Sequence, residues 1–96
     1  MADFLVRVEL FGASSQGYER LHEGVEALGP KRSVVFEDGG VYDMPTGTYF
    51  GESNLDVSAL RDRVRTVARP LSPHKDAAVF VCSVQPHQWA AFLYKG

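Results

Sequence analysis

The sequence predicts one α+β domain in which an antiparallel sheet of four strands carries two helices on one face. Short segments that alternate apolar and polar residues are interleaved with two longer segments whose apolar residues recur every three or four positions. A chain of 96 residues can build one hydrophobic core but hardly two, so the expected domain spans residues 1–96. Hydrophobic residues make up 45% of the chain and charged residues 23%, as in ordinary globular proteins.

The first strand and the first helix are predicted from the N-terminal third. Residues 4–10 change from an apolar run to alternating apolar and charged residues, which indicates a strand with one face in the core. Residues 12–15 break this strand and offer serine hydroxyls as helix N-caps. An apolar stripe at helical spacing follows, formed by Tyr18, Leu21, Val25 and Leu28. Gly29 and Pro30 then end the helix, because glycine accepts a left-handed cap and proline cannot continue it.

Two further strands are predicted between the helices. Residues 32–36 are rich in β-branched side chains and form the second strand. Residues 37–40 form a turn, and residues 41–44 are a continuation or a bulged extension of the ladder. Residues 48–53 form the third strand, in which Gly51 indicates a bulge or a close approach of another backbone segment.

The second helix has the clearest pattern. Asp56 is a suitable N-cap, the helix ends near Pro70, and its apolar stripe consists of Val57, Leu60, Val64, Val67 and Ala68. Residues 77–84 are almost continuously apolar, which predicts a central, well-buried strand with Cys82 as a buried structural thiol. The aromatic tail, residues 88–94, is either a short final strand or a helical turn.

The resulting order is β-α-β-β-α-β with a short C-terminal extension. With right-handed crossovers, this order predicts the ferredoxin-like sandwich, in which two helices cover one sheet face. The other face is expected to be solvated or covered by a second subunit. A homodimer is expected because a small monomer does not readily hide so many aromatic side chains, namely Phe11, Tyr42, Tyr49, Trp89, Phe92 and Tyr94.

Cellular location is inferred from what the sequence contains. Cys82 is the only cysteine, so an internal disulfide framework is excluded and a cytoplasmic setting is expected. The apolar stretches are a few residues long, whereas about 20 are needed to span a bilayer. No membrane partner is therefore expected.

Charge is distributed unevenly along the chain. Residues 1–56 hold four Lys and Arg and ten Asp and Glu, whereas residues 57–96 hold six Lys and Arg and two Asp and Glu. Arg61, Arg65 and Arg69 fall on one flank of the second helix, and Arg63 points elsewhere. This row, together with Ser33, is a candidate RNA-binding surface, because guanidinium groups suit phosphates. The alternative is pairing with the glutamates of the first helix, Glu19, Glu23 and Glu26.

Glu9, Arg20 and His22 are the candidate catalytic residues. A carboxylate near the end of the first strand, with an arginine and a histidine on the next helix, offers an acid/base pair and a cation for RNA cleavage. The competing interpretation is a solvated strand residue and two ordinary helix-surface residues. The sequence holds no Walker loop, HExxH, CxxC or GxSxG motif, its three histidines are scattered, and it singles out no metal site or cofactor.

Several segments resemble one known family. Phe4–Glu9, Tyr18–Leu21, Ser33–Val35 and the closing Phe92–Lys95 resemble the GhoS-like family of small endoribonuclease antitoxins from type V toxin–antitoxin systems. The resemblance implies a ferredoxin-like fold, RNA as the substrate and cleavage of the toxin's messenger RNA. It also implies roles for Glu9, Arg20 and Ser33, whereas His22 departs from the basic residue expected at its position.

Two other functions remain open at the level of sequence. The acidic first half is typical of a non-enzymatic interaction module, such as a phage or mobile-element inhibitor of a bacterial defence complex, in the manner of anti-CRISPR proteins. The aromatic surplus is also compatible with a homodimer that senses a small ligand beneath the sheet. The expected partners are therefore RNA, a second copy of the chain or a protein complex of the host.

Overall fold

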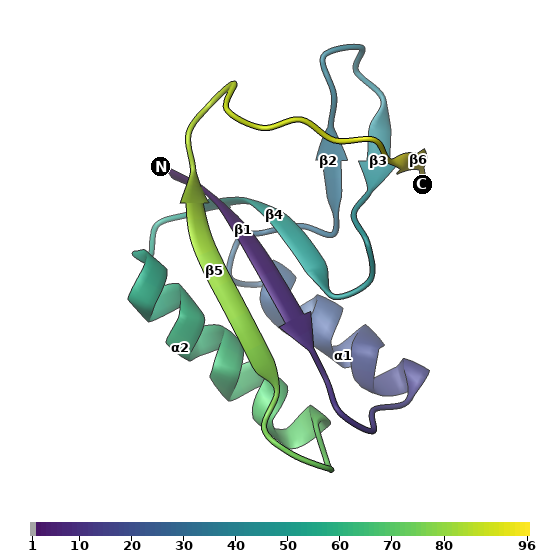
Figure 1. Ribbon diagram of the computed structural model, residues 1–96, viewed down its shortest axis with the longest axis vertical. Helices are drawn as coiled ribbons and strands as arrows, with labels where there is room; N and C mark the ends of the chain where they lie inside the picture. The colour runs from purple at the N-terminus through teal and green to yellow at the C-terminus, as the bar shows by residue number, and fades with distance from the viewer. Residues whose placement is uncertain (1) are drawn as a thin grey trace.

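The main sheet has three strands, with the first strand in the middle. The structure is a computed structural model that describes residues 2–96. Strand β1 (Ala2–Glu9) pairs on one side with β4 (Thr48–Ser53) and on the other with β5 (Ala78–Val84), antiparallel in both cases (Figure 1). Val6 lies opposite Tyr49 of β4, and the same residue lies opposite a valine of β5. Side chains alternate along a strand, so the buried even-numbered residues of β1 face one side of the sheet.

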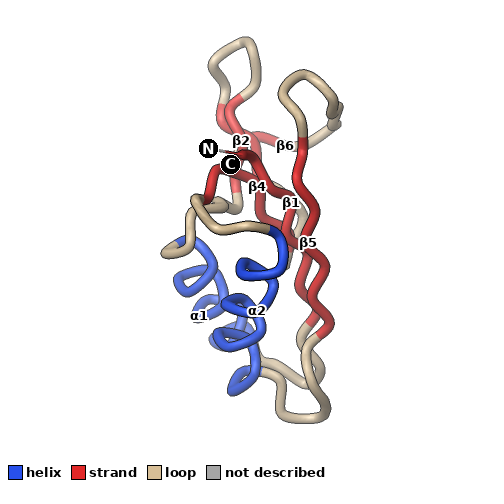
Figure 2. Tube along the Cα trace, turned by 90° about the vertical axis from the view of Figure 1, so that its left-hand side faces the viewer, coloured by secondary structure: helices blue, strands red, loops and turns tan. Residues whose placement is uncertain are grey.

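Both helices lie on that side of the sheet, as the sequence predicts. Figure 2 shows α1 (Ser15–Glu26) and α2 (Val57–Ala68) together on one side of the strands. Ser14 begins α1, and its hydroxyl accepts a hydrogen bond from the Gly17 N–H at 3.2 Å. This cap satisfies one of the backbone donors that the first helical turn leaves without a partner.

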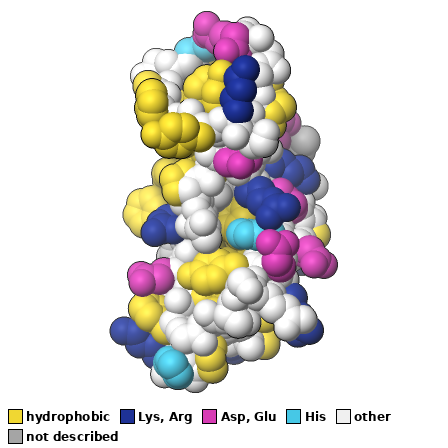
Figure 3. Space-filling view, turned by 90° about the vertical axis from the view of Figure 1, so that its right-hand side faces the viewer, with side chains coloured by type: hydrophobic (Ala, Val, Ile, Leu, Met, Phe, Trp, Pro, Cys, Tyr) yellow, Lys and Arg dark blue, Asp and Glu magenta, His cyan; other side chains and the backbone are white. Residues whose placement is uncertain are grey.

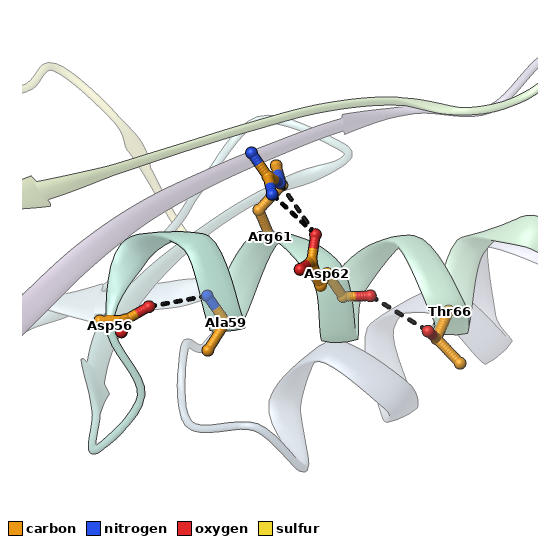
Figure 4. Close-up of polar contacts among 5 residues, drawn as sticks. All are labelled: Asp56, Ala59, Arg61, Asp62 and Thr66. Atoms are coloured by element: carbon orange, nitrogen blue, oxygen red, sulfur yellow. Dashed lines mark hydrogen bonds and ion pairs between the residues drawn. The ribbon is translucent and has the colours of Figure 1, made fainter.

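Helix α2 is capped in the same way. Asp56 begins the helix, and its carboxylate accepts a hydrogen bond from the Ala59 N–H at 2.8 Å (Figure 4). A single 3-10 turn, η1 (Arg69–Leu71), with Pro70 near its start, follows the last residue of the helix. Both predicted starts and the predicted end near Pro70 are confirmed.

The core is a single cluster between the sheet and the helices. Tyr49 is its largest fully buried side chain, which corrects its inclusion among the expected surface aromatics. Full burial of one Val, Leu or Phe side chain in this core contributes about 1.5–3 kcal/mol to the stability of the fold. The other buried members come from both helices, β1 and the residue that follows β1, namely Phe4, Val6, Val8, Leu10, Leu21, Val25, Leu60, Val64 and Ala68.

Two glycines allow close approaches that a side chain would block. A methyl group at Gly24 of α1 would overlap the Val67 side chain of α2, so this glycine sets how closely the two helices pack. Gly51 of β4 has φ +154°, and a Cβ there would lie 3.3 Å from the Pro30 Cα. The predicted close backbone approach at Gly51 is therefore confirmed.

A second small sheet replaces the expected continuation of the first. Strands β2 (Ser33–Val35), β3 (Val41–Asp43) and β6 (Tyr94–Lys95) are antiparallel, in the order β2-β3-β6. An isolated bridge between Lys31 and Phe50 joins this part of the chain to β4, with N–O distances of 2.9 and 2.8 Å. The chain thus forms two three-stranded sheets where one four-stranded sheet was predicted. The tail, predicted over residues 88–94 as a strand or a helical turn, is irregular over residues 88–93 and forms a strand at Tyr94–Lys95.

Strand β5 is an edge strand, so its predicted central position is wrong. It pairs with β1 alone within residues 2–96. Phe80 is 62% exposed, and Cys82 is half-buried rather than buried. Continuous apolarity is typical of a strand buried on both faces, but here one face of the strand is open. Over residues 2–96, no helix is both long enough and apolar enough to cross a bilayer.

Candidate binding cleft

An open cleft of about 910 Å³ lies where the main sheet, β2 and the chain after β5 meet. Its apolar part includes Phe50 of β4, Phe36 just after β2, and Trp89 in the tail. The Trp89 ring centroid is 5.2 Å from that of Phe50 and 6.0 Å from that of Phe36. These three rings bring together segments that are far apart in the sequence, so the cleft is a product of the tertiary fold.

The tail is held across the sheet at both of its ends. Pro86 and His87 occupy the centre of a turn in which the Gln88 N–H donates to the Gln85 carbonyl at 3.1 Å. His87 has φ 63°, the left-handed conformation that the second central residue of a type II turn requires. At the far end, β6 pairs with β3. The tail therefore crosses from the end of β5 to the second sheet (Figure 1).

The charged groups of the cleft are all acidic. Four carboxylates line it, those of Asp3, Glu37, Asp38 and Glu52, and no Lys or Arg is among its lining residues. The other lining residues are Ser33, Val34, Val35, Phe36, Phe50, Gly51, Pro86, His87, Trp89, Ala90 and Ala91. Hydrogen bonds from the Gly40 N–H at 2.7 Å and the Tyr42 hydroxyl at 3.0 Å lower the pKa of Asp38. The cleft therefore combines apolar surface with negative potential, a combination that favours a ligand with both apolar and cationic groups.

A smaller and more polar pocket of about 410 Å³ lies beside α1. Its lining includes His22, Arg32, Asp43 and Thr46. The His22 Nδ1 lies 2.6 Å from the Tyr49 hydroxyl, so this hydrogen bond ties α1 to β4. Figure 3 looks onto the side of the molecule where α1 lies, and shows acidic and basic side chains interleaved there.

Burial shifts the pKa values of both His22 and Tyr49. Burial lowers the pKa of His22, as does the nearby Arg32 guanidinium, while Glu19 and Glu26 act in the opposite direction. Burial also raises the pKa of Tyr49 far above its usual range. Both groups are thereby held in their neutral forms near neutral pH, which suits a structural hydrogen bond between them.

The three predicted catalytic residues do not converge. Glu9 is exposed and belongs to the odd-numbered residues of β1, whose side chains face away from the helices. Arg20 is exposed on α1 and precedes His22 by two positions, so the two side chains point about 200° apart around the helix. Only His22 reaches a pocket. The geometry thus leaves a carboxylate on one side of the sheet and a histidine on the other.

The predicted RNA-binding residues also lie apart. Arg61, Arg65 and Arg69 are exposed, on α2 and at the start of η1, whereas Ser33 lines the acidic cleft. Arg61 forms an ion pair with its neighbour Asp62 at 2.9 Å (Figure 4).

The alternative pairing between the two helices is not formed. Glu19 lies 3.8 Å from Arg32, which follows α1, and Glu26 accepts a hydrogen bond from the backbone N–H of that same arginine. Glu19 thus meets a guanidinium group and Glu26 a backbone N–H, both of a residue that lies close to them in sequence. Between residues 2 and 96, neither Arg65 nor Arg69 forms an ion pair.

Several residues of the cleft could not be recognised from local sequence patterns. Asp3 and Glu52 read as ordinary strand residues, and they face the cleft because β1 and β4 pair beside it. In the sequence, Trp89 is one of many aromatic residues. The available signal was its place after the Pro86–His87 turn, which redirects the tail toward the sheet.

Metal-ligating side chains do not cluster. Within residues 2–96, no group of three or more His, Cys, Asp or Glu residues is placed to hold a metal ion. Comparison with known proteins adds no relative, because the chain matches no protein-family model and no curated protein.

Proposed function

We propose that the protein is a non-enzymatic interaction module whose cleft receives a basic, partly apolar segment of a partner protein. The observation that carries this proposal is the composition of the cleft, in which four carboxylates surround exposed apolar surface without any Lys or Arg. A volume of about 910 Å³ accommodates a few side chains of a peptide. The separation of Glu9 from His22 across the sheet supports binding over catalysis.

The chemistry of the cleft suggests which proteins would be partners. Proteins that bind nucleic acids carry basic surfaces that contact the phosphate backbone. An acidic module placed on such a surface would compete with the nucleic acid, and long-range attraction would speed the encounter. The partner we propose is therefore a nucleic-acid-binding protein of the host, consistent with an inhibitor of a defence complex.

Fluorescence anisotropy with a short labelled peptide tests this proposal. The peptide carries Lys and Arg around a central Leu-Phe pair, and its charge-reversed counterpart carries Glu at each basic position. We expect the basic peptide to bind with an affinity that falls with salt, and the reversed peptide to bind far more weakly. Equal binding of the two peptides would contradict the proposal.

Neutral variants locate the binding site. The double variant Glu37→Gln/Glu52→Gln removes two cleft carboxylates and should weaken binding about two- to thirtyfold, at about 0.2–1 kcal/mol for each exposed ion pair. The matched control is Glu9→Gln/Glu23→Gln, which removes two exposed carboxylates outside the cleft. Equal losses in the two variants would show that net charge alone, and not the cleft, attracts the peptide.

A second candidate function is RNA binding by an antitoxin-type endoribonuclease with a ferredoxin-like arrangement. The exposed Arg65 and Arg69, neither in an ion pair within residues 2–96, favour it. The strand order β5-β1-β4, with the Lys31–Phe50 bridge leading toward β2, supports the proposed arrangement. Incubation with labelled RNAs tests this candidate, which predicts RNA cleavage and a salt-sensitive binding that weakens in Arg65→Gln/Arg69→Gln. RNA left intact and unbound would contradict it.

A further inference from the structure

The outer edge of β5 has no strand partner within residues 2–96, and its sequence lacks the residues that commonly protect an edge strand. Its sequence, Ala78–Val84, contains no charged residue, proline or glycine. Within residues 2–96 it pairs with β1 alone, so its other side presents backbone N–H and C=O groups without strand partners. Natural edge strands are commonly blocked by charges, proline or bulges, because an open edge is a template for another strand.

Two arginines lie near the start of this edge. Val67 faces α1 at Gly24, and Arg65 and Arg69 lie two positions to either side of Val67, about 200° around the helix. They therefore lie on the side of α2 turned away from α1. Arg65 and Arg69 also line a small hollow with Asp76 and Ala77, the residues that lead into β5. Helix α2 lies along the β5 side of the sheet and α1 along the β4 side (Figure 1).

We propose that the outer edge of β5 binds an extended acidic segment of a partner protein as an added antiparallel or parallel strand. The partner's backbone would pair with β5, and its carboxylates, on the side of the helices, would meet Arg65 and Arg69. Its alternate side chains would lie on the opposite face, beside the exposed Phe80. The ideal segment thus alternates acidic and apolar residues. This surface is distinct from the cleft and does not depend on the function proposed for it.

Charge complementarity favours this occupant over two others. A second copy joined edge to edge would add another β5, which contains no charged residue and so leaves Arg65 and Arg69 without carboxylate partners. RNA phosphates would satisfy the guanidinium groups, but a phosphate backbone cannot continue a β-ladder along β5. An acidic strand satisfies both the arginines and the strand edge.

Amide hydrogen exchange of the full chain, followed by NMR, tests the proposal with defined probes. The first probe is a short peptide of alternating Glu and Val, and the second is the same peptide with a central proline, which removes a ladder hydrogen bond. An alternating Lys and Val peptide and a single-stranded oligouridine complete the set. We expect only the first peptide to protect alternate amides of β5 from exchange.

Paired variants connect this protection to the arginines. Arg65→Gln/Arg69→Gln should weaken binding of the Glu-Val peptide about three- to tenfold, whereas the control Arg20→Gln/Arg63→Gln, which removes two exposed arginines elsewhere, should leave it nearly unchanged. Three results would overturn the proposal. They are equal protection of β5 by the Lys-Val peptide, binding of oligouridine at Arg65 and Arg69 in preference to the peptide, and β5 amides already protected in the free protein by dimer formation.

Discussion

The hydrogen bond between His22 and Tyr49 joins α1 to the main sheet across 27 positions of sequence. The phenol is fully buried and the imidazole is half-buried, with their ring centroids 5.7 Å apart. A neutral imidazole can accept a hydrogen bond from the hydroxyl at Nδ1, whereas a charged one can only donate to the hydroxyl oxygen, because both of its nitrogens are then donors. Because a charged imidazole is disfavoured in this half-buried position, the stability of the protein depends on the protonation state of His22.

This dependence predicts how stability changes with pH. The pKa of His22 is lowered from its ordinary value of 6.5, chiefly by burial and then by Arg32, so between the two values the unfolded chain binds more protons than the folded one. Stability therefore rises with pH across that window and is lost as pH falls below about 6.5. Urea unfolding at about pH 7.5, 6.5 and 5.5 should show a steeper loss for the wild type than for His22→Gln, which does not titrate. An equal loss of unfolding free energy with falling pH in the wild type and in His22→Gln would contradict this prediction.

At the scale of elements, the contact between Gly24 and Val67 fixes the spacing of the two helices. Alanine in a helix is normally favoured over glycine by about 1 kcal/mol. Here the added methyl group overlaps the Val67 side chain, and overpacking of this kind costs about 1–3 kcal/mol.

We therefore predict that Gly24→Ala destabilises the protein by about 1 kcal/mol, measured by urea unfolding. Combination with Val67→Ala creates space for the new methyl group. The loss in free energy of unfolding should consequently be smaller in the double variant than the sum of the losses in the two single variants, by about 0.5–2 kcal/mol. An increase in stability on Gly24→Ala alone would show that the helices are not in tight contact at this point.

The predictability of each element depended on whether its signal was local. The two helices were predicted to within a few residues, because apolar stripes, the caps Ser14 and Asp56, and the stop at Gly29 lie within or beside the helices themselves. Strand β5 was misplaced to the centre of the sheet. A strand with apolar residues on both faces is usually buried on both faces. The same pattern also occurs in an edge strand that pairs with another chain.

At the scale of the whole molecule, the cleft depends on contacts that no local pattern encodes. The tail closes it through the pairing of β6 with β3 and through the packing of Trp89 on Phe50. The separation of Glu9 from His22 likewise follows from the face that each residue occupies in the folded chain. Sequence reasoning identified residue types with suitable chemistry, but whether such residues converge is decided by strand pairing.

The central claim is that the cleft, and no other surface, receives a basic and partly apolar segment. Titration of the ¹⁵N-labelled protein with the basic Leu-Phe peptide, followed by amide chemical shifts, tests it most directly. The largest changes are expected on cleft-lining residues such as Val35, Gly51 and Ala90, with little change along α2. Changes centred on α2, or on the pocket of His22, with the cleft unaffected, would contradict it.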